Sequence, residues 1–397
     1  MNRFDQELHQ RLATIRQHGL YRALQVVESP QDREIIVDGK RLLNFSSNDY
    51  LGLANHPALK EAAVEAIQKF GAGSGASRLV CGSLAPHHHL EGMLASFKGT
   101  EAALSFSTGY ATALGTITAL MGSGDVLILD KLVHACIVDA AKLSGAKLRV
   151  FAHNDADDLE KKLKWADERK NSESQAQRVL IVTESIFSMD GDKAPLREII
   201  ALKEKYGAWL MLDEAHATGL FGQNRRGLAE VSDVAHQIEI QMGTLGKALG
   251  ASGGYVCGSR ALIDLLINRA RSFIFSTAPT PAAAAGAAAG IRVTQSAEGG
   301  NRNNTVWNLA KLFRQLADSP DVSSAMPHSL IIPIHIGDEN RAVSVAAQLR
   351  ELGVFVPAIR YPTVARGSAR LRATLTAAHK HEDVSTLVDV LKTVLKP

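Results

Sequence analysis

Residues 178–219 read RVLIVTESIFSMDGDKAPLREIIALKEKYGAWLMLDEAHATG, and this stretch decides the fold. Its two apolar runs, at 179–182 and 209–212, are typical of strands buried on both faces, because polar residues do not alternate with them. The charged segment between them, residues 196–207, predicts a helix. A strand, a helix and a second strand in this order predict a parallel pair joined by a helical crossover.

The same alternation extends outward over residues 58–292. We expect helices at 58–71, 108–121, 134–145 and 155–170, and further strands at 101–106, 126–130 and 147–152. This rhythm predicts an α/β fold whose large domain holds a mostly parallel sheet between helices. Ligands bind at the carboxyl ends of the strands in such sheets, so the residues there are the first candidates for chemistry.

The two flanks of this region predict smaller parts. Residues 1–57 are expected to form an N-terminal arm, with helical spacing over 4–22 and a hairpin around the turn Asp38-Gly39. After the alanine-rich stretch 278–290, which predicts a long helix, residues 293–397 alternate between short apolar runs and amphipathic segments. They predict a small C-terminal α+β domain.

The composition excludes several classes of protein. The 397 residues carry 44 Lys and Arg against 41 Asp and Glu, so the near-neutral balance argues against binding to nucleic acid or an acidic membrane surface. Cys81, Cys136 and Cys257 are scattered and odd in number, which favours reduced thiols. The charged, amphipathic start is unlike a signal peptide, and the apolar stretches are too short to span a bilayer. We expect a soluble, cytoplasmic protein.

Lys247 lies in the segment QMGTLGKALGASGG (241–254), which is rich in small residues. No carboxylate precedes it nearer than Glu239, and glycines on both sides would let a ligand approach closely. Burial would lower the pKa of this amine and make it nucleophilic, as a Schiff-base lysine requires. A surface lysine in a glycine-rich turn explains the segment equally well.

Asp213 ends a predicted buried strand, and His216 follows three residues later. A carboxylate in this place can hold a ring nitrogen protonated, and it can also simply cap the next helix. The letters DEAH at 213–216 also match the magnesium carboxylates of a helicase-like ATPase. That interpretation requires a phosphate loop, G-x-x-x-x-G-K-[ST], which the sequence lacks, so we reject it.

Other candidates lie at turns and near the C-terminus. The turn Ser107–Tyr110 leads from a strand into a helix, whose first N–H groups can bind phosphate. His134 begins a helix and could stack on a flat cofactor, although a lone histidine is more often structural. The run His87–His89 does not predict a metal site, because adjacent helical side chains diverge. Arg370 and Arg372 would share one face of a strand, and their guanidinium groups suit a carboxylate.

Taken together, these segments resemble the α-oxoamine synthases, a family of pyridoxal 5′-phosphate (PLP) enzymes of fold type I, the aspartate aminotransferase-like fold. The shared motifs run nearly end to end, in the family's order: FSSNDYLGL (45–53), GSGASRLVCG (73–82), STGYATALG (107–115), LVHACIVD (132–139), TESIFSMDGD (183–192), LDEAHATGLFG (212–222), GTLGKALG (243–250), FSTAP (275–279) and the arginine-rich tail segment.

The resemblance implies a role for each matching residue. Lys247 resembles the lysine that carries the cofactor, Asp213 the partner of the pyridine nitrogen, and His134 the stacking residue. His216 and Ser188 resemble the partners of the ring hydroxyl. The phosphate contacts would be Thr108, Gly109, Tyr110, Thr244 and, from a second subunit, Ser276 and Thr277. The substrate-binding residues would be Arg372, Asn48, Arg360 and, for the far end of an acyl chain, Arg22.

The family's reaction joins an amino acid to an acyl thioester with loss of CO₂, and its members share active sites within a homodimer. The segments GLYRAL (19–24) and GASRLV (75–80) are most similar to those members that condense L-alanine with pimeloyl-CoA, or its carrier-protein thioester, in biotin synthesis. Glycine or serine with another acyl-CoA, and an aminotransferase of the same fold, stay open as alternatives.

Overall fold

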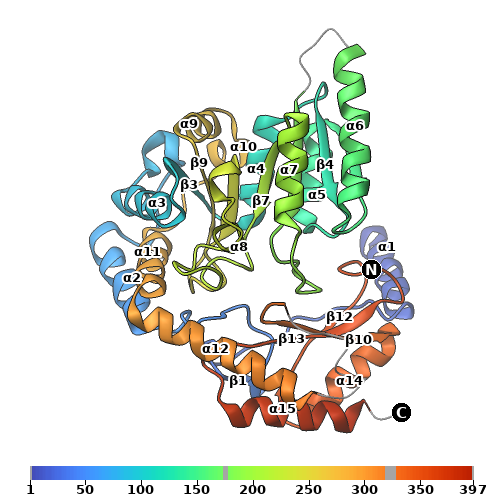
Figure 1. The fold of residues 1–397 in the computed structure, drawn as a ribbon. Helices are drawn as coiled ribbons and strands as arrows, with labels where there is room; N and C mark the ends of the chain where they lie inside the picture. The colour runs from blue at the N-terminus through green and yellow to red at the C-terminus, as the bar shows by residue number, and fades with distance from the viewer. Residues whose placement is uncertain (1, 173–177, 318–327, 396–397) are drawn as a thin grey trace. The chain divides into compact units, whose positions relative to one another are not determined.

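The computed structural model describes residues 2–172, 178–317 and 328–395 (Figure 1). The chain divides into two compact units. Unit 1 comprises residues 1–50, 189–191 and 304–397, and unit 2 comprises residues 51–188 and 192–303. The N-terminal arm is therefore grouped with the C-terminal part. The boundaries at 57 and 292 that we expected from the sequence stay a prediction.

Unit 2 is built on a seven-stranded sheet with the order β3-β9-β8-β7-β6-β4-β5. The strands are β3 (Ala102–Phe106), β4 (Val126–Asp130), β5 (Lys147–Phe151), β6 (Val179–Glu184), β7 (Trp209–Asp213), β8 (Ile240–Thr244) and β9 (Gly254–Gly258). β9 is antiparallel to both of its neighbours, β3 and β8, while the other pairs among these strands are parallel. The expected mostly parallel sheet is confirmed, and its carboxyl ends meet at one edge.

Helices cover both faces of this sheet. Successive residues of a strand point to opposite faces, so neighbouring residues contact different helices. Leu104 and Val256 pack with α4 (Gly109–Leu120), α5 (Ala135–Ser144), α9 (Arg260–Arg269) and α10 (Arg271–Ile274). Their neighbours Ala103 and Cys257 face α3 (Ala85–Lys98) and α11 (Pro281–Gln295) on the other side.

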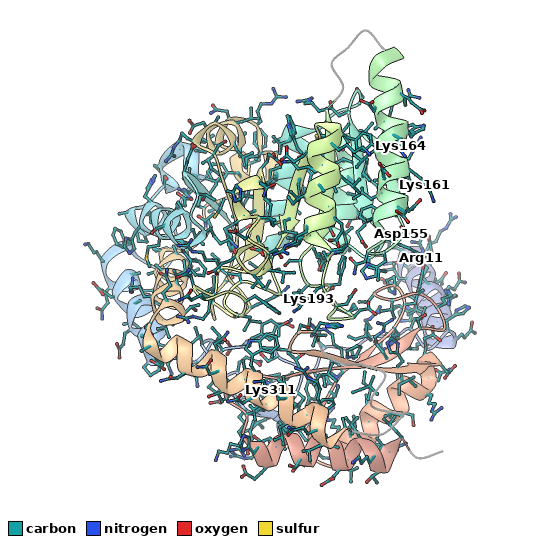
Figure 2. All side chains as sticks on the ribbon, in the orientation of Figure 1. Arg11, Asp155, Lys161, Lys164, Lys193 and Lys311 are labelled. Carbon is teal, nitrogen blue, oxygen red and sulfur yellow. The ribbon has the colours of Figure 1, made fainter. Side chains whose placement is uncertain are left out.

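The remaining helices of unit 2 complete its outer layer. They are α2 (Pro57–Phe70), α6 (Ala156–Ser172), α7 (Leu196–Tyr206), the short α8 (Leu228–Val231) and the turns η1 (Arg78–Gly82) and η2 (Ala235–Gln237). α12 (Ala297–Leu316) crosses from unit 2 into unit 1. The outward face of α6 is charged, with Lys161 and Lys164 exposed on it (Figure 2).

Unit 1 joins both ends of the chain. Helix α1 (Arg3–Gln17) ends before Gly19, which adopts φ +65°, so the helix is shorter than the predicted 4–22. β1 (Glu34–Val37) and β2 (Lys40–Asn44) form the hairpin at the Asp38-Gly39 turn. β2 also pairs with β11 (Val354–Phe355), which lies about three hundred residues later in the chain.

The rest of unit 1 is a second small sheet with two helices. β10 (Ile331–Gly337), β13 (Ala369–Thr374) and β12 (Ala358–Ile359) form the sheet in that order, and the helices are α14 (Glu339–Glu351) and α15 (His381–Val394). No helix in the described ranges is long and apolar enough to cross a membrane.

Candidate active site

The predicted cofactor residues gather at the carboxyl edge of the sheet in unit 2. Asp213 ends β7, and Thr244 ends β8 beside it. Lys247 follows in the turn after β8, while Thr108 and Gly109 begin α4 directly after β3. Parallel pairing places the ends of β6, β7 and β8 side by side. The antiparallel pair of β3 and β9, in which Phe106 lies opposite Gly254, brings the start of α4 to the segment that follows Lys247.

Lys247 and His216 form a direct polar contact at this edge. Nζ of Lys247 lies 2.7 Å from Nε2 of His216, and the histidine is buried while the lysine is half-buried. A protonated amine can donate to a neutral imidazole nitrogen at this distance. A surface lysine, the alternative left open by the sequence, does not fit this placement.

Asp213 and Glu184 are two buried carboxyl groups on adjacent strands. They are direct partners in the parallel register of β6 and β7, and both are at most 5% exposed. Burial raises the pKa of Asp213, and the positive charge of Lys247 opposes the rise. Burial also raises the pKa of Glu184 well above its usual range, and the neighbouring Asp213 adds to the effect. The two buried carboxyl groups thus each disfavour the charged form of the other, and Lys247 offsets part of this effect.

His134 is fixed in a neutral form at the start of α5. Its Nδ1 accepts a hydrogen bond from the N–H of Cys136 at 3.2 Å, so this nitrogen carries no proton. Its own backbone N–H donates to Oε1 of Glu184 at 2.5 Å. Burial lowers the pKa of the ring, which the nearby Asp213 partly offsets. A neutral, oriented imidazole at the strand ends can present its flat face to a ligand.

The start of α4 presents backbone donors at the same edge. Oγ1 of Thr108 caps the helix by accepting from the N–H of Ala111 at 3.0 Å. The first N–H that donates to a backbone carbonyl of the helix is that of Thr112, to Thr108. The N–H groups of Gly109 and Tyr110 lie before it, in the turn where such groups can bind an anion. A Cβ on Gly254 would lie 2.7 Å from both N and Cα of Gly109, so glycine is required there for this close approach.

The two remaining cofactor candidates have different surroundings. Ser188 is buried, directly after Phe187 in the segment that follows β6. Thr277 is exposed and pairs with Ser77 in an isolated bridge, beside Ser276. Its role as a contact from a second subunit stays a prediction.

The four predicted substrate residues lie in unit 1. Nη1 of the buried Arg372 donates to Oδ1 of Asn48 and to Oγ1 of Thr374, both at 3.1 Å. Arg360 donates to the carbonyls of Gly19 and Tyr21, and Arg22 donates to the carbonyl of Tyr361 at 2.8 Å. Arg372 and Asn48 are therefore brought together, while Arg22 and Arg360 tie the arm to the loop that follows β12.

Glu184 is the residue that the sequence analysis missed. It ends a buried apolar run, as Asp213 does on the next strand, and that parallel was the signal that could have identified it. The histidine run at 87–89 contributes structure: His87 accepts at Nδ1 from the N–H of Leu84 and contacts the carbonyl of Pro279 through Nε2. No group of three metal-ligating side chains occurs in the residues that the structure describes.

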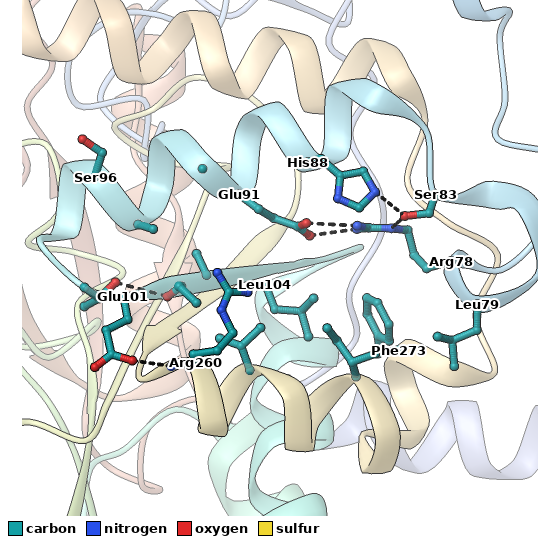
Figure 3. Close-up of a pocket in the computed structure, with 17 residues that line it drawn as sticks. Arg78, Leu79, Ser83, His88, Glu91, Ser96, Glu101, Leu104, Arg260 and Phe273 are labelled. Atoms are coloured by element: carbon teal, nitrogen blue, oxygen red, sulfur yellow. Dashed lines mark hydrogen bonds and ion pairs between the residues drawn. The ribbon is translucent and has the colours of Figure 1, made fainter.

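A cavity of about 700 Å³ lies elsewhere in unit 2, beside the edge strand β3 (Figure 3). Its polar wall is an ion pair of Arg78 with Glu91, whose two hydrogen bonds measure 2.8 and 3.0 Å. At its other end, the N–H of Arg260 donates to Glu101. The charged groups of the ion pair satisfy each other, and the residues that line this cavity do not include the predicted cofactor residues.

Comparisons with known proteins agree with this geometry. Residues 40–391 match the family "aminotransferase class I and II". The 8-amino-7-oxononanoate synthase of Geobacter sulfurreducens is 46% identical over 385 residues, covering 97% of each chain.

Solved structures share the fold. A serine palmitoyltransferase from S. paucimobilis with a bound PLP–myriocin aldimine matches with a TM-score of 0.90 and 28% identity, over 99% of this chain and 98% of that one. The 8-amino-7-oxononanoate synthase of Francisella tularensis matches with a TM-score of 0.72 and 27% identity, over 89% and 97%. The chain belongs to the class I and II aminotransferase family and, within it, to the α-oxoamine synthases of PLP fold type I.

Proposed function

We propose that this chain condenses L-alanine with a pimeloyl thioester, of CoA or of a carrier protein, to give 8-amino-7-oxononanoate for biotin synthesis. The chain is a PLP-dependent acyltransferase. The observation that carries the proposal is the cluster of Lys247, His216 and Asp213 at the strand ends, in a chain 46% identical to a synthase of that name. The serine palmitoyltransferases resemble it in fold, but at only 28–30% identity.

The donor set of unit 2 fits the cofactor. The N–H groups at the start of α4 suit its phosphate, and the close approach of Gly254 to Gly109 keeps that corner open to a ligand. The buried Asp213 can pair with a protonated ring nitrogen, a partner that a carboxylate with little access to water requires. His216 and Ser188 would hold the ring hydroxyl, and His134 would lie against the ring.

When bound, PLP supplies a ring that withdraws electrons from Cα of the amino acid. Asp213 would keep a proton on the nitrogen of that ring. Lys247 would hold the cofactor and, once its amine is released, remove the Cα proton as a general base. His216, 2.7 Å from that amine, orients Nζ and can share its proton. A bond then forms between Cα and the acyl carbon, the thioester C–S bond breaks, and the carboxylate leaves as CO₂ before Cα is reprotonated.

Arg372 is assigned to the carboxylate of the amino acid. Its guanidinium is buried and held by Asn48 and Thr374, so it is oriented before a substrate arrives. Arg22 and Arg360 stay candidates for the far carboxylate of the acyl chain, although their present hydrogen bonds go to backbone carbonyls.

A homodimer and a cytoplasmic location are part of the proposal. Large apolar side chains are exposed next to Thr277: Phe275 is 69% exposed and Val80 is 78% exposed. The bridge between Ser77 and Thr277 brings their segments together, so a second copy covering them would also meet Thr277. The free cysteines of the described chain suit a reducing compartment.

The visible spectrum of the purified protein, titrated with L-alanine, glycine and L-serine, tests the proposal. We expect a yellow protein whose band shifts with L-alanine, and release of thiol when a pimeloyl thioester is added. A response only to L-serine would favour a palmitoyltransferase-like activity. A protein that stays colourless with added PLP would refute the enzyme assignment.

A further inference from the structure

A short hairpin carries Ser188 at the end of the sheet. Ile186 pairs with Lys193 in an isolated bridge, and the N–H of Phe187 donates to the carbonyl of Asp192 at 3.1 Å. The N–H of Ala194 closes the base by donating to the carbonyl of Ser185. The tip of the hairpin is therefore residues 188–191, and Gly191 turns the chain back with φ +71°.

His153, in the loop after β5, contacts both strands of this hairpin. Its Nε2 lies 2.7 Å from Oδ2 of Asp192, and its Nδ1 lies 2.9 Å from Oδ1 of Asp130 at the end of β4. The ring of Phe187 packs edge-on against the imidazole, with centroids 4.3 Å apart and planes at 90°. Asn154 adds a hydrogen bond from Nδ2 to Oδ2 of Asp192 at 2.8 Å.

The contacts require a charged histidine. Both ring nitrogens face carboxylate oxygens, which only accept, so both nitrogens must carry protons. Burial opposes the charge, but the hydrogen bonds to Asp130 and Asp192 raise the pKa of His153 to about 10. The two carboxylates thus favour the charged form of the histidine, which lies between two anions that would otherwise repel each other.

The tip of the hairpin has a second attachment. Residues 189–191 belong to unit 1, where Asp190 forms an ion pair with the buried Arg370 of β13. Arg372, the residue assigned to the substrate carboxylate, lies two positions further on the same strand and therefore on the same face. The hairpin is one continuous segment that carries Ser188 in unit 2 and, at its tip, Asp190, the ion-pair partner of Arg370 on β13.

We propose that His153 is a positioning residue that holds the 185–194 hairpin, and through it sets both Ser188 and the Asp190 ion pair on β13. This inference rests on the proposed function of Ser188 and Arg372. It predicts that loss of the contacts between His153 and the hairpin weakens two binding steps together: binding of PLP through Ser188, and binding of the amino acid through β13. Neither effect follows from a general loss of stability.

The test compares His153→Gln and Asp192→Asn with His236→Gln, a control at an exposed histidine that lies outside this cluster. We expect both hairpin variants to weaken PLP binding and to raise KM for L-alanine, each by about tenfold, the factor for one lost hydrogen bond between charged groups. Amide hydrogen exchange of residues 185–194 in the cofactor-free protein should accelerate, while exchange in α7 should not. The control should change none of these quantities.

The outcomes distinguish a failure of the proposed function from a failure of the positioning role of His153. If the native protein binds neither PLP nor L-alanine, the proposed function fails. If it binds both, and the variants keep native affinities with unchanged exchange in the hairpin, the positioning role is wrong. A lower melting temperature with native PLP affinity and KM would likewise overturn it, because it would leave His153 a purely structural role.

Discussion

Lys98 and Glu214 form an ion pair in the interior of unit 2, with side chains 1% and 0% exposed. Lys98 is the last residue of α3, and it also donates to the carbonyl of Arg226. The second carboxylate oxygen of Glu214 accepts from the N–H of Ala229 at 2.9 Å. Glu214 lies between Asp213 and His216 in the chain, so this pair anchors the turn that carries both.

The substitution Lys98→Met would leave the carboxylate of Glu214 buried without its cation. Breaking one side of a buried pair costs about 3–5 kcal/mol of unfolding free energy. For domains of 150–250 residues each kcal/mol lowers Tm by about 2–4 °C, so we expect a fall of roughly 6–20 °C. Scanning calorimetry of the holoenzyme measures it. The control is Lys205→Met, which breaks the surface pair with Glu160 and should lower Tm far less, because water and salt screen an exposed pair.

The double variant Lys98→Met with Glu214→Gln tests the cause. The glutamine amide can still accept from the N–H of Ala229, and it carries no charge, so no charge is left buried. We expect it to recover most of the lost stability. If Lys98→Met melts within about 2 °C of the native protein, or the double variant melts no higher than the single one, the reasoning is refuted.

Three further predictions concern the site and unit 1. Lys247→Ala should fold normally but hold PLP without a covalent bond, so that borohydride treatment followed by mass spectrometry finds no attached cofactor. Gly254→Ala puts a methyl group 2.4 Å from Oγ1 of Thr112 and 2.7 Å from the start of α4, so PLP affinity should fall about tenfold or more. The control is Gly73→Ala, whose methyl group meets open space, and this variant should bind PLP normally. Burial lowers the pKa of His379 to about 4 in the folded protein. The free energy of unfolding should therefore be highest above about pH 6.5 and fall by roughly 3 kcal/mol as the pH falls towards 4. In urea titrations at several pH values, His379→Gln should make this dependence on pH weaker.

The parts of the fold that depend on local pattern were predictable from the sequence. The runs 179–182 and 209–212 are apolar without alternation, which only a strand covered on both faces tolerates, and both are strands of the central sheet. Two features depend on distant partners and were not predicted. β9 runs antiparallel, and nothing local to GYVCG encodes direction. β2 pairs with β11, a contact that only the folded chain reveals.

Some residues of the candidate site are likewise indicated by a local pattern, while others depend on distant partners. Asp213, His216 and Lys247 could be proposed because each stands out against its own neighbours: a carboxylate after an apolar run, a histidine in the next turn, and a lone lysine among glycines. Glu184 carries the same local signal as Asp213, a carboxylate at the end of an apolar run, but the sequence does not show which groups it faces. Its significance comes from register, which sets it opposite Asp213 and under the N–H of His134. His153 was likewise unnoticed, since its two carboxylate partners follow different strands.

Arg370 and Arg372 show where sequence reasoning stops and structure takes over. Both lie on one face of β13, both are buried, and periodicity cannot choose between them. The structure separates them by the charge of their partners. Arg370 meets the carboxylate of Asp190, so its charge is already neutralised, whereas the hydrogen bonds of Arg372 to Asn48 and Thr374 go to neutral groups. A planar guanidinium suits a carboxylate, which is the role that we propose for Arg372. In this proposal two identical side chains, two residues apart, have different tasks: Arg370 pairs with Asp190 at the tip of the hairpin, and Arg372 binds the substrate carboxylate.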